Sequence, residues 1–470
     1  MPATKPTSEP GISSWERGLV LFISALGGFL VTFMTSAVNL ALPRIGEEFH
    51  TSAVTLSWVS LVYMLVSGAC LLPMGRLGDL YGRVRVFNYG MVGFCLFAVA
   101  SALAPSIEVL LVFRALHGVG LAVGSAISMA LVVSAYPPES RGRALGLVVA
   151  SVYVGLSLGP VVGGLIVHYL GWRMLFVVTG VLGLFNLGIG FGKLRGVEWR
   201  EPKTGPFDVA GAAVYAVGFV CLLLGFSLLP EVLGVALLVV GAIGLAAFLR
   251  VEARAADPLL NVSLFRVNRV FAFANLAAFL QYGATSAMVF LLSLYLQYNR
   301  SLDAQEAGLV LVTGNVVQVV CASIAGRLAD RVSTRLLASL GLGISVLGLV
   351  GFAFLGADTA YWYVVVMLCL VGAGVATFAA PNTHVVVSSV EASYVGIASA
   401  ILAAMRQAGM NMSQAVATLV LALEVGRTAI QPADHPQLLS SIRLSFLIFV
   451  VLSVVGVAAS LVGPRRMLRT

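Results

Sequence analysis

Charged residues are scarce in this sequence. Only 10% of its 470 residues are Asp, Glu, Lys or Arg, whereas 59% are hydrophobic. A soluble domain carries about 25% charged residues, so this composition excludes an ordinary soluble protein and is typical of a chain whose solvent is mostly lipid. Apolar runs of about 20 residues, the length that crosses a bilayer core, recur along the whole chain. The sequence therefore predicts an all-α membrane protein with many crossings.

Signatures of several other protein classes are missing as well. The five cysteines are an odd number without metal-ligand spacing, and all lie in apolar runs, which predicts small core residues. The sequence has no phosphate-binding loop of the type Gly-x-x-x-x-Gly-Lys-Ser/Thr and no recognisable nucleophile with its partners. We therefore expect no catalytic residues, no metal and no cofactor. The net charge of +8 is explained by basic cytoplasmic loops, so we expect no nucleic-acid partner.

The apolar runs number fourteen, and an even number places both termini on one side. On that side fall 21 of the Lys and Arg residues and on the other side five, while Arg114 and Arg406 lie inside runs. The positive-inside rule then predicts a plasma-membrane protein with both termini in the cytoplasm. The expected spans are 18–41, 55–74, 86–104, 108–135, 144–170, 172–191, 209–228, 232–249, 270–297, 304–325, 336–355, 360–380, 394–425 and 441–463.

One polar segment occurs twice. GRLGDLYGRVR at 75–85 returns as GRLADRVSTR at 326–335, each time after the second helix of a six-helix group. Such a repeat predicts two parallel halves, joined by an insert that carries an extra helix pair. The expected units are an N-terminal bundle, 1–200, a linker with two transmembrane helices, 201–265, and a C-terminal bundle, 266–470.

Four stretches of the sequence carry a resemblance to a known family. The segment 75–85 matches Gly-x-Leu-x-Asp-x-x-Gly-Arg, RALHGVGLA at 114–122 matches most of Arg-x-x-Gln-Gly-x-Gly, and GLSLGPVVGG at 155–164 matches Gly-x-x-x-Gly-Pro-x-x-Gly-Gly. The fourth stretch, 251–275, is similar to a family linker. Together they resemble the major facilitator superfamily, and within it the fourteen-helix drug:proton antiporters. The resemblance implies two six-helix bundles that alternate access to a midplane cavity.

The polar turn at 75–85 is expected to act as a conformational latch. Its glycines let two helix ends approach, and Asp79 can accept charge-assisted hydrogen bonds from Arg83 or from a helix N-terminus. The resemblance implies that this turn holds the halves together on the cytoplasmic side when the cavity opens outward. The alternative is a purely topological role, because arginines gather in any cytoplasmic loop. The expected latch comprises Gly75, Asp79, Gly82, Arg83 and Asp330.

Glycines four residues apart mark the stretch 155–164. Gly155, Gly159 and Gly163 share one stripe of a helix, which lets a partner backbone approach closely. Pro160 removes a backbone hydrogen bond and favours a bend. We expect a packing hinge that also includes Gly164; tight packing without a role in export is the alternative.

Ionisable residues at membrane depth are costly and are therefore candidates for function. Arg114 and His117 are three apart on one helix face, and His117 stands where the family has glutamine. A histidine titrates near pH 6.5, so His117 is a candidate proton carrier, against a neutral hydrogen-bonding role. Arg114 and Arg406 are candidates for coupling or substrate binding, against structural bonds to carbonyls. Glu424 is the remaining coupling candidate.

The stretch FMTSAVNLALPRI at 33–45 departs from the family pattern Leu-Asp-x-Thr-x-Val-Asn-x-Ala-Leu-Pro at one important position. Met34 replaces the aspartate, which the resemblance implies as a proton- or cation-binding group. What remains is an apolar cavity with scattered neutral polar groups, suited to neutral or amphipathic organic molecules; the alternative is that these side chains only pack between helices. The candidate lining residues are Met34, Asn39, Tyr153, Gln281, Tyr282, Asn315, Gln318, Gln407 and Asn411.

The sequence thus predicts a secondary transporter rather than an enzyme. We expect export of small lipophilic or amphipathic organic compounds by alternating access, in exchange for protons, with the bilayer and the substrate as partners. Met34 keeps two alternatives open. One is uncoupled or differently coupled transport of a neutral metabolite or lipid-like molecule, and the other is a membrane sensor or scaffold that does not transport.

Overall fold

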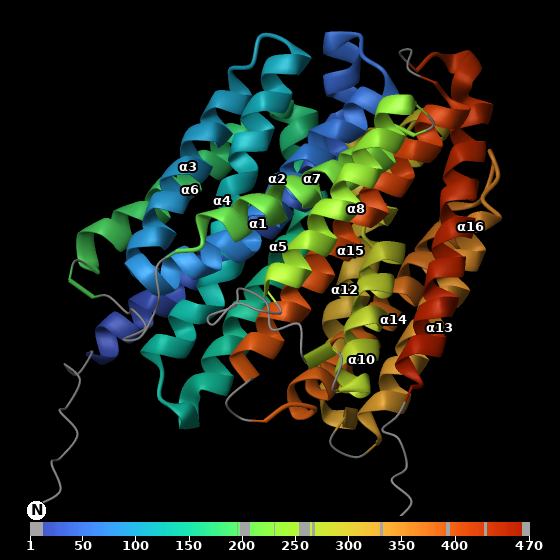
Figure 1. Cartoon of the computed structure of the whole chain (residues 1–470). Coiled ribbons are helices and arrows are strands. Elements are labelled where there is room, and N and C mark those ends of the chain that lie inside the picture. The colour runs from blue at the N-terminus through green and yellow to red at the C-terminus, as the bar shows by residue number, and fades with distance from the viewer. Residues whose placement is uncertain are drawn as a thin grey trace, which may run out of the picture.

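The computed structural model of this chain describes residues 13–194, 196–197, 207–229, 231–252, 264–265, 268–329, 332–391, 395–426 and 430–462, and regular structure in this part is entirely helical (Figure 1). Thirteen of its helical segments are long and apolar enough to cross a membrane. A further long helix, α15 (Val395–Glu424), runs beside them and carries the polar cluster around Arg406. The fourteen predicted helices and the all-α membrane fold are therefore confirmed.

The helices follow the predicted order in two groups of six with a hairpin between them. The first group comprises α1 (Ser14–Phe49), α2 (Ala53–Tyr81), α3 (Arg83–Ala102), α4 (Ile107–Ala135), α5 (Pro138–Leu170) and α6 (Trp172–Lys193). The hairpin is α7 (Val209–Ser227) and α8 (Val232–Glu252). The second group comprises α10 (Arg269–Thr285) continued by α11 (Met288–Leu294) and the π-helical turn η1 (Tyr295–Asn299), then α12 (Ala304–Ala329), α13 (Thr334–Ala353), α14 (Tyr361–Ser388), α15, the short η3 (Pro432–Asp434) and α16 (His435–Ser460). We call α1–α6 the N half and α10–α16 the C half.

The polar turn expected at 75–85 is mostly helix, which corrects the sequence prediction. Helix α2 continues through Gly75 and Asp79 to Tyr81, and α3 begins at Arg83, so Gly82 alone breaks the two helices. The prediction placed the end of the helix where the apolar run ends. A helix has no reason to stop there, because its backbone hydrogen bonds continue into water, and the break comes only at Gly82, whose positive φ ends the helix.

Gly82 holds a backbone conformation that only glycine adopts readily, with φ at 109°. We expect Gly82→Ala to destabilise the protein by about 1–3 kcal/mol, the usual cost of forcing a side chain into such a region. Gly75→Ala is the matched control, because Gly75 is helical and an added β-carbon would meet its nearest neighbour, Ala126, at 4.0 Å. Thermal unfolding of the two variants in detergent should show a lower midpoint for Gly82→Ala only; equal midpoints would contradict the prediction.

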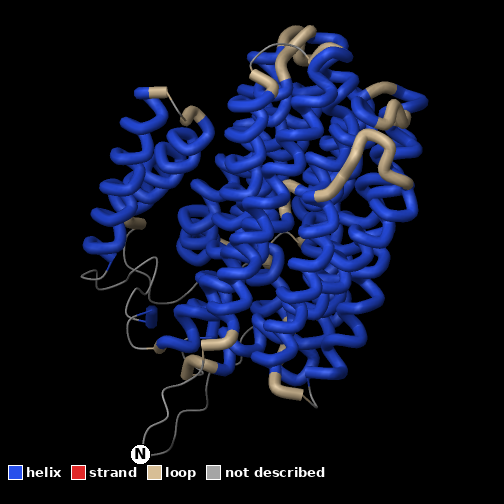
Figure 2. The backbone as a smooth tube through the Cα atoms, turned by 90° about the vertical axis from the view of Figure 1, so that its right-hand side faces the viewer, coloured by secondary structure: helices blue, strands red, loops and turns tan. Residues whose placement is uncertain are grey.

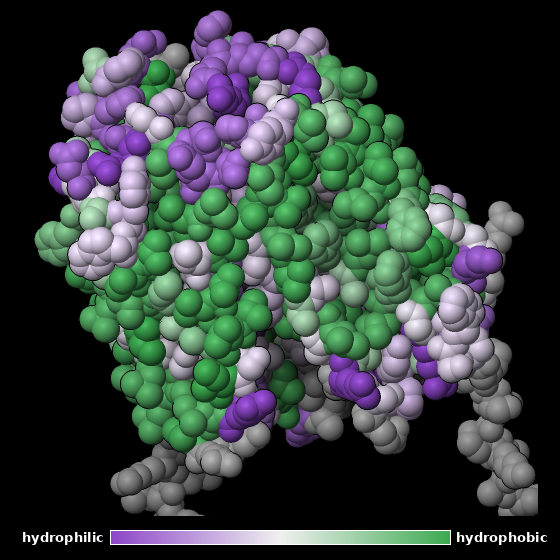
Figure 3. Space-filling view, turned by 180° about the vertical axis from the view of Figure 1, so that it is seen from behind, coloured by the Kyte–Doolittle hydropathy of each residue, from purple (hydrophilic) through white to green (hydrophobic). Residues whose placement is uncertain are grey.

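On the face that Figure 3 shows, an apolar belt lies between two more polar ends. We call the end where α1 begins and α16 ends the terminal end, which is the lower end in Figure 1, and the opposite one the far end. Large apolar side chains such as Phe185, Ile243 and Leu347 are exposed on the helices of this belt. The belt has the character of a lipid-facing surface, because in water an exposed apolar area of this extent would drive aggregation.

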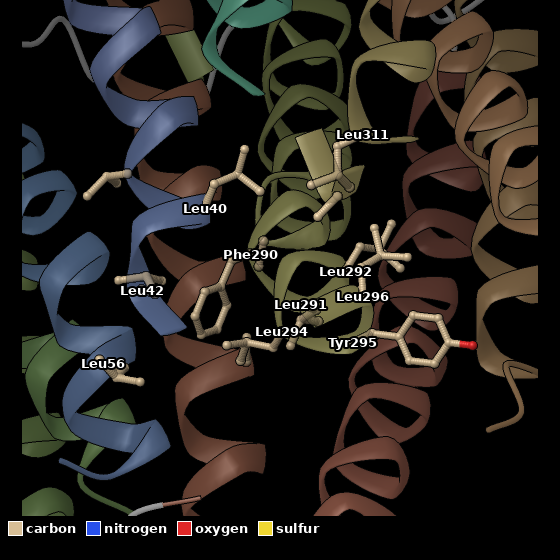
Figure 4. Packing of buried hydrophobic residues seen from close by; sticks show 14 of the residues in the cluster. Leu40, Leu42, Leu56, Phe290, Leu291, Leu292, Leu294, Tyr295, Leu296 and Leu311 are labelled. Atoms are coloured by element: carbon tan, nitrogen blue, oxygen red, sulfur yellow. The ribbon is translucent and has the colours of Figure 1, made fainter. Parts of the chain in front are cut away.

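The buried hydrophobic residues show that the two halves are joined at the far end. One large cluster combines residues of α1 and α2, such as Leu40 and Leu56, with residues of α11, such as Phe290 (Figure 4). Toward the terminal end the buried residues of a second cluster, around Phe87, all belong to the N half, with Met410 of α15 packed against them, and a third cluster, around Phe271, lies within the C half. Figure 3 shows a hollow at the lower edge of the molecule. The structure is thus closed at the far end and packed as two bodies at the terminal end.

Helices α7 and α8 form a hairpin that stands at one side of the main bundle (Figure 2). Tyr215 and Phe219 of α7 pack in one cluster with Leu65 of α2 and Ala415 of α15. The Tyr215 hydroxyl also donates to the Gly68 carbonyl of α2 over 3.0 Å. The inserted hairpin therefore contacts both halves at the α2–α15 seam.

Candidate functional site

Polar contacts join the N half to the C half toward the far end, along the interface between the halves, which we call the seam. The Thr418 hydroxyl of α15 lies 2.8 Å from the Ser57 hydroxyl of α2. Nearer the middle of the same two helices, the Gln407 amide donates to the Met64 carbonyl over 3.5 Å. At the surface of the far end, Nδ1 of His168 lies 3.4 Å from Oδ2 of Asp303. The two partners of this ion pair belong to opposite halves of the molecule. Both side chains are about one-third exposed, so the pair contributes little to holding the far end closed.

Two prolines create further contact points between the halves. A proline has no N–H, so it leaves the carbonyl four residues earlier without its helical partner. Pro160 frees the Leu156 carbonyl of α5, which accepts a hydrogen bond of 2.8 Å from the Asn315 amide of α12 and one of 3.3 Å from Ser36 of α1. A carbonyl freed at membrane depth must find such partners, because lipid offers none.

Pro43 repeats this arrangement in α1. It frees the Asn39 carbonyl, and the Ser293 hydroxyl of α11 donates to that carbonyl over 2.7 Å. In both cases one donor comes from the opposite half. Asn315 was expected to line a cavity, but the structure gives its amide this contact between the halves.

The glycines of α5 lie where other helices come closest. A β-carbon added at Gly159 would stand 2.6 Å from the Ser36 β-carbon, and one at Gly163 2.6 Å from that of Ala37, while Gly155 meets the same face of α1. Gly164 instead faces the Ala304 carbonyl of the C half. The stripe therefore packs α5 against α1 and, at its far end, against α12. Whether Pro160 also acts as a hinge stays a prediction.

A small cavity lies in the seam between the halves. Its volume is about 30 Å³, enough for one or two water molecules rather than for an organic compound. The Ser60 hydroxyl donates to Oδ1 of Asn39 over 2.9 Å within this lining. Seven lining residues come from the N half and two, Ser286 and Gln414, from the C half, so the cavity depends on how the halves meet. The full lining is Thr35, Val38, Asn39, Ser60, Tyr63, Met64, Arg114, Ser286 and Gln414.

Arg114 is the charged group of this cavity and is fully buried. Its Nε donates to the Val59 carbonyl over 3.0 Å, and its guanidinium carbon lies 3.9 Å from the centre of the Tyr63 ring, the geometry of a cation–π contact. Its Nη1 lies 3.3 Å from Nδ1 of His117. Because arginine only donates, Nδ1 must accept, which assigns His117 as a neutral imidazole with its proton on Nε2. That Nε2 is buried without a hydrogen-bond partner.

Arg406 is a second cation near the seam, on the C half. It donates to the Thr383 hydroxyl, and its guanidinium carbon lies 5.6 Å from the centre of the Tyr282 ring. Tyr153 of α5 lies near both Arg406 and Tyr282. The structure thus brings together three residues that the sequence singled out separately.

The other predicted residues are placed apart from this cavity. Met34 is buried, with its sulfur 3.7 Å from the Thr179 hydroxyl of α6 inside the N half. Gln281 donates to Ser345 over 2.9 Å inside the C half, and Asn411 packs close to Gly68 of α2. Gln318 is half-buried on α12. Glu424 is exposed at the far end of α15, where it accepts a hydrogen bond of 3.4 Å from Ser440.

The expected latch lies within the N half in this structure. Asp79 accepts hydrogen bonds of 2.7 and 2.9 Å from Arg83, which also donates to the Ala130 carbonyl and to Ser134 of α4. The ion pair therefore ties the terminal end of α2 to α3 and α4. Asp330 lies outside the described residues, so the second aspartate of the repeat is not placed.

Sequence reasoning missed several partners at the seam. Tyr63, Ser293 and Gln414 carry no motif, and each acquires its place only through packing between elements distant in the chain. One signal was available: the i−4 rule for proline identifies the Leu156 and Asn39 carbonyls from sequence alone. It does not identify their donors. Among the described residues there is also no group of three or more His, Cys, Asp or Glu side chains that could hold a metal ion.

Comparison with known proteins gives one family. The chain matches the family model described as Major Facilitator Superfamily over residues 24–413, with a second match over 274–468. It is similar to the riboflavin transporter RibZ of Clostridioides difficile (strain 630), with 28% identity over 406 residues, covering 86% of this chain and 87% of that protein. The multidrug resistance protein Stp of Mycobacterium tuberculosis (strain CDC 1551 / Oshkosh) is 31% identical over 416 residues, 87% of this chain and 77% of its own. The multidrug efflux pump LfrA of Mycolicibacterium smegmatis (strain ATCC 700084 / mc(2)155) is 30% identical over 413 residues, 85% of this chain and 79% of its own.

Proposed function

This chain belongs to the Major Facilitator Superfamily, a family of transporters, and we propose that it exports small lipophilic or amphipathic organic compounds across the cell membrane by alternating access, in exchange for protons. The observation that carries the proposal is the asymmetry of the seam. One apolar cluster spans both halves at the far end, and separate clusters fill each half at the terminal end. Two bodies that share their largest apolar cluster at one end are the arrangement that a rocking motion requires.

The proposed orientation places the terminal end in the cytoplasm. The bias of Lys and Arg toward that side supports it, and the structure then corresponds to a state that is open to the cytoplasm and closed to the outside. The Asp79–Arg83 pair, held within the N half here, fits a latch that would engage the C half only in the opposite state.

His117 is the proposed proton carrier, with Arg114 beside it. The buried Nε2 of His117 and its neutral tautomer leave one ring nitrogen bonded to Arg114 and the other without a partner. A group whose protonation is coupled to the movement of the two halves must contact a residue that lies between them. Arg114 meets that condition, because it lines the cavity between the halves.

Proton flux in proteoliposomes tests this proposal. A pH dye inside the vesicles is followed while lipophilic cations, neutral compounds and amphipathic organic acids are added to wild-type protein and to His117→Gln, which keeps a hydrogen-bonding side chain. We expect proton movement that depends on substrate in the wild type and at least a tenfold slower flux in the variant. Proton flux of equal rate in both proteins would contradict the role of His117, and the absence of any substrate movement would contradict export.

A second candidate is transport of a neutral metabolite without proton coupling. Met34, buried where the family pattern has an aspartate, favours it, and so does the similarity to a riboflavin transporter. In the same vesicles this candidate predicts substrate movement with no change in internal pH.

A further inference from the structure

Arg114 is a buried cation without a carboxylate partner. Its hydrogen bonds to Val59 and His117 use two of the five N–H groups of a guanidinium, and its Nη2 has no hydrogen-bond partner at all. Neither bonded group carries a negative charge. Burying a cation in this way is costly unless an anion compensates it.

The described part of the chain holds no acid that could supply this anion. Every described Asp and Glu lies in a loop or within three residues of the end of its helix. Arg114 is the eighth residue of α4 and faces Val59 and Tyr63 in the interior of α2. Arg406 is likewise in the middle of its helix and makes its contacts with Thr383 and Tyr282, which are neutral. The membrane interior described here therefore carries positive charge near the seam and no negative charge.

The cavity beside Arg114 would grow when the halves move, because Ser286 and Gln414 of the C half form part of its wall. The rest of the wall offers hydroxyls and amides, and Nε2 of Gln414 is another buried donor without a partner. Unused donors on a cation and on a neighbouring amide are the groups that recognise a carboxylate. A cationic ligand would meet repulsion there.

We propose that the compound this protein transports carries an anionic group, a carboxylate or one of similar charge, which binds to Arg114 while its apolar body occupies the seam. The inference rests on the export function proposed above and narrows its substrates to amphipathic organic acids. Such acids differ in charge from the cationic compounds that an aspartate at position 34 would bind. An inorganic anion such as chloride has the same chemistry, and the test separates the two.

The test compares acids with their amides, which match in shape and differ in charge. The probes are pyrenebutyrate, naphthaleneacetate and dodecanoate with the three corresponding carboxamides, and binding to purified protein in phosphatidylcholine nanodiscs is measured by equilibrium dialysis in sulfate buffer, with empty nanodiscs subtracted. We expect at least one acid to bind tenfold or more tightly than its amide. A panel in which no acid is preferred, whether or not the amides bind, overturns the proposal.

Variants assign the preference to Arg114. Arg114→Gln should reduce the acid preference to less than threefold, and Arg114→Lys, which keeps the charge with fewer donors, should retain part of it. Arg250→Gln is the control, because Arg250 is exposed at the end of the hairpin helix α8. A preference that persists in Arg114→Gln overturns the assignment; if this variant does not fold, Arg114→Lys must still lower the preference.

Further outcomes distinguish failure of this inference from failure of the export function on which it rests. Transport of amides but not of acids in proteoliposomes would contradict the proposed anion site but not the proposed export function. Acid binding that is lost in Arg114→Gln but never followed by transport would support the site and contradict the exporter. Loss of acid binding when chloride replaces sulfate at equal concentration would assign Arg114 to chloride and overturn the proposal.

Discussion

Replacing Gly308 with alanine is expected to open the far end of the protein. Gly308 of α12 faces α5, and a β-carbon at this position would overlap the backbone carbonyl of Pro160. A backbone carbonyl cannot rotate away as a side chain does, so the clash is relieved only if α5 and α12 separate. Overpacking of this kind costs about 3 kcal/mol, which corresponds to a more than hundredfold shift between two states.

The expected shift is measurable as a distance between the halves. Spin labels at Glu47 of α1 and Asp358 of the α13–α14 loop, in a background without the native cysteines, report on opposite halves at the far end. Gly308→Ala should move the distance distribution to longer values without unfolding the protein, since alanine is the better helix former. Gly146→Ala on α5 is the control, because nothing lies within 4 Å of its added β-carbon. An unchanged distribution in Gly308→Ala would show that the seam absorbs the methyl group.

The fold was largely predictable from the sequence, because a membrane chain has few solutions. Long apolar runs must be helices in lipid, and the repeat of residues 75–85 at 326–335 gave the two halves. The boundaries were less predictable. Apolar runs end where the bilayer ends, whereas α1 extends from Ser14 to Phe49 and α2 continues to Tyr81, because helical hydrogen bonding continues in water until a cap residue stops it.

The candidate site was predictable only in part, since sequence identifies costly residues but not their partners. Arg114, His117 and Arg406 stood out as ionisable groups in apolar runs. Their surroundings depend on contacts between residues far apart in the chain, such as Arg114 with Val59, or Gln414 with the N-half cavity wall. Met34 shows the same limit: its position matched a family pattern, but the structure turns its side chain toward Thr179 and away from the seam cavity.

Asn315→Leu is the second change expected to open the far end, for an electrostatic rather than a steric reason. Leucine has the shape of asparagine but cannot donate to the Leu156 carbonyl, which Pro160 has left without its helical partner. A buried polar group that loses its hydrogen bond costs about 1–3 kcal/mol. The carbonyl keeps only the weaker 3.3 Å bond from Ser36 in the closed state, whereas separation of the halves admits water to it. The ratio of closed to open molecules should therefore fall by roughly 5–150-fold.

A double-mutant cycle shows whether the proline is the cause. Alanine at position 160 restores an N–H to α5, and the Leu156 carbonyl then has a helical donor that does not depend on the C half. In a Pro160→Ala background, Asn315→Leu should change the distance between the Glu47 and Asp358 labels by much less than it does in the wild type. If the two effects are equal, Asn315 acts on the seam by packing alone, and the carbonyl freed by Pro160 is not what holds the halves together. A coupling close to the whole effect of Asn315→Leu would instead mean that the proline in α5 serves closure of the far end as well as any bending of the helix.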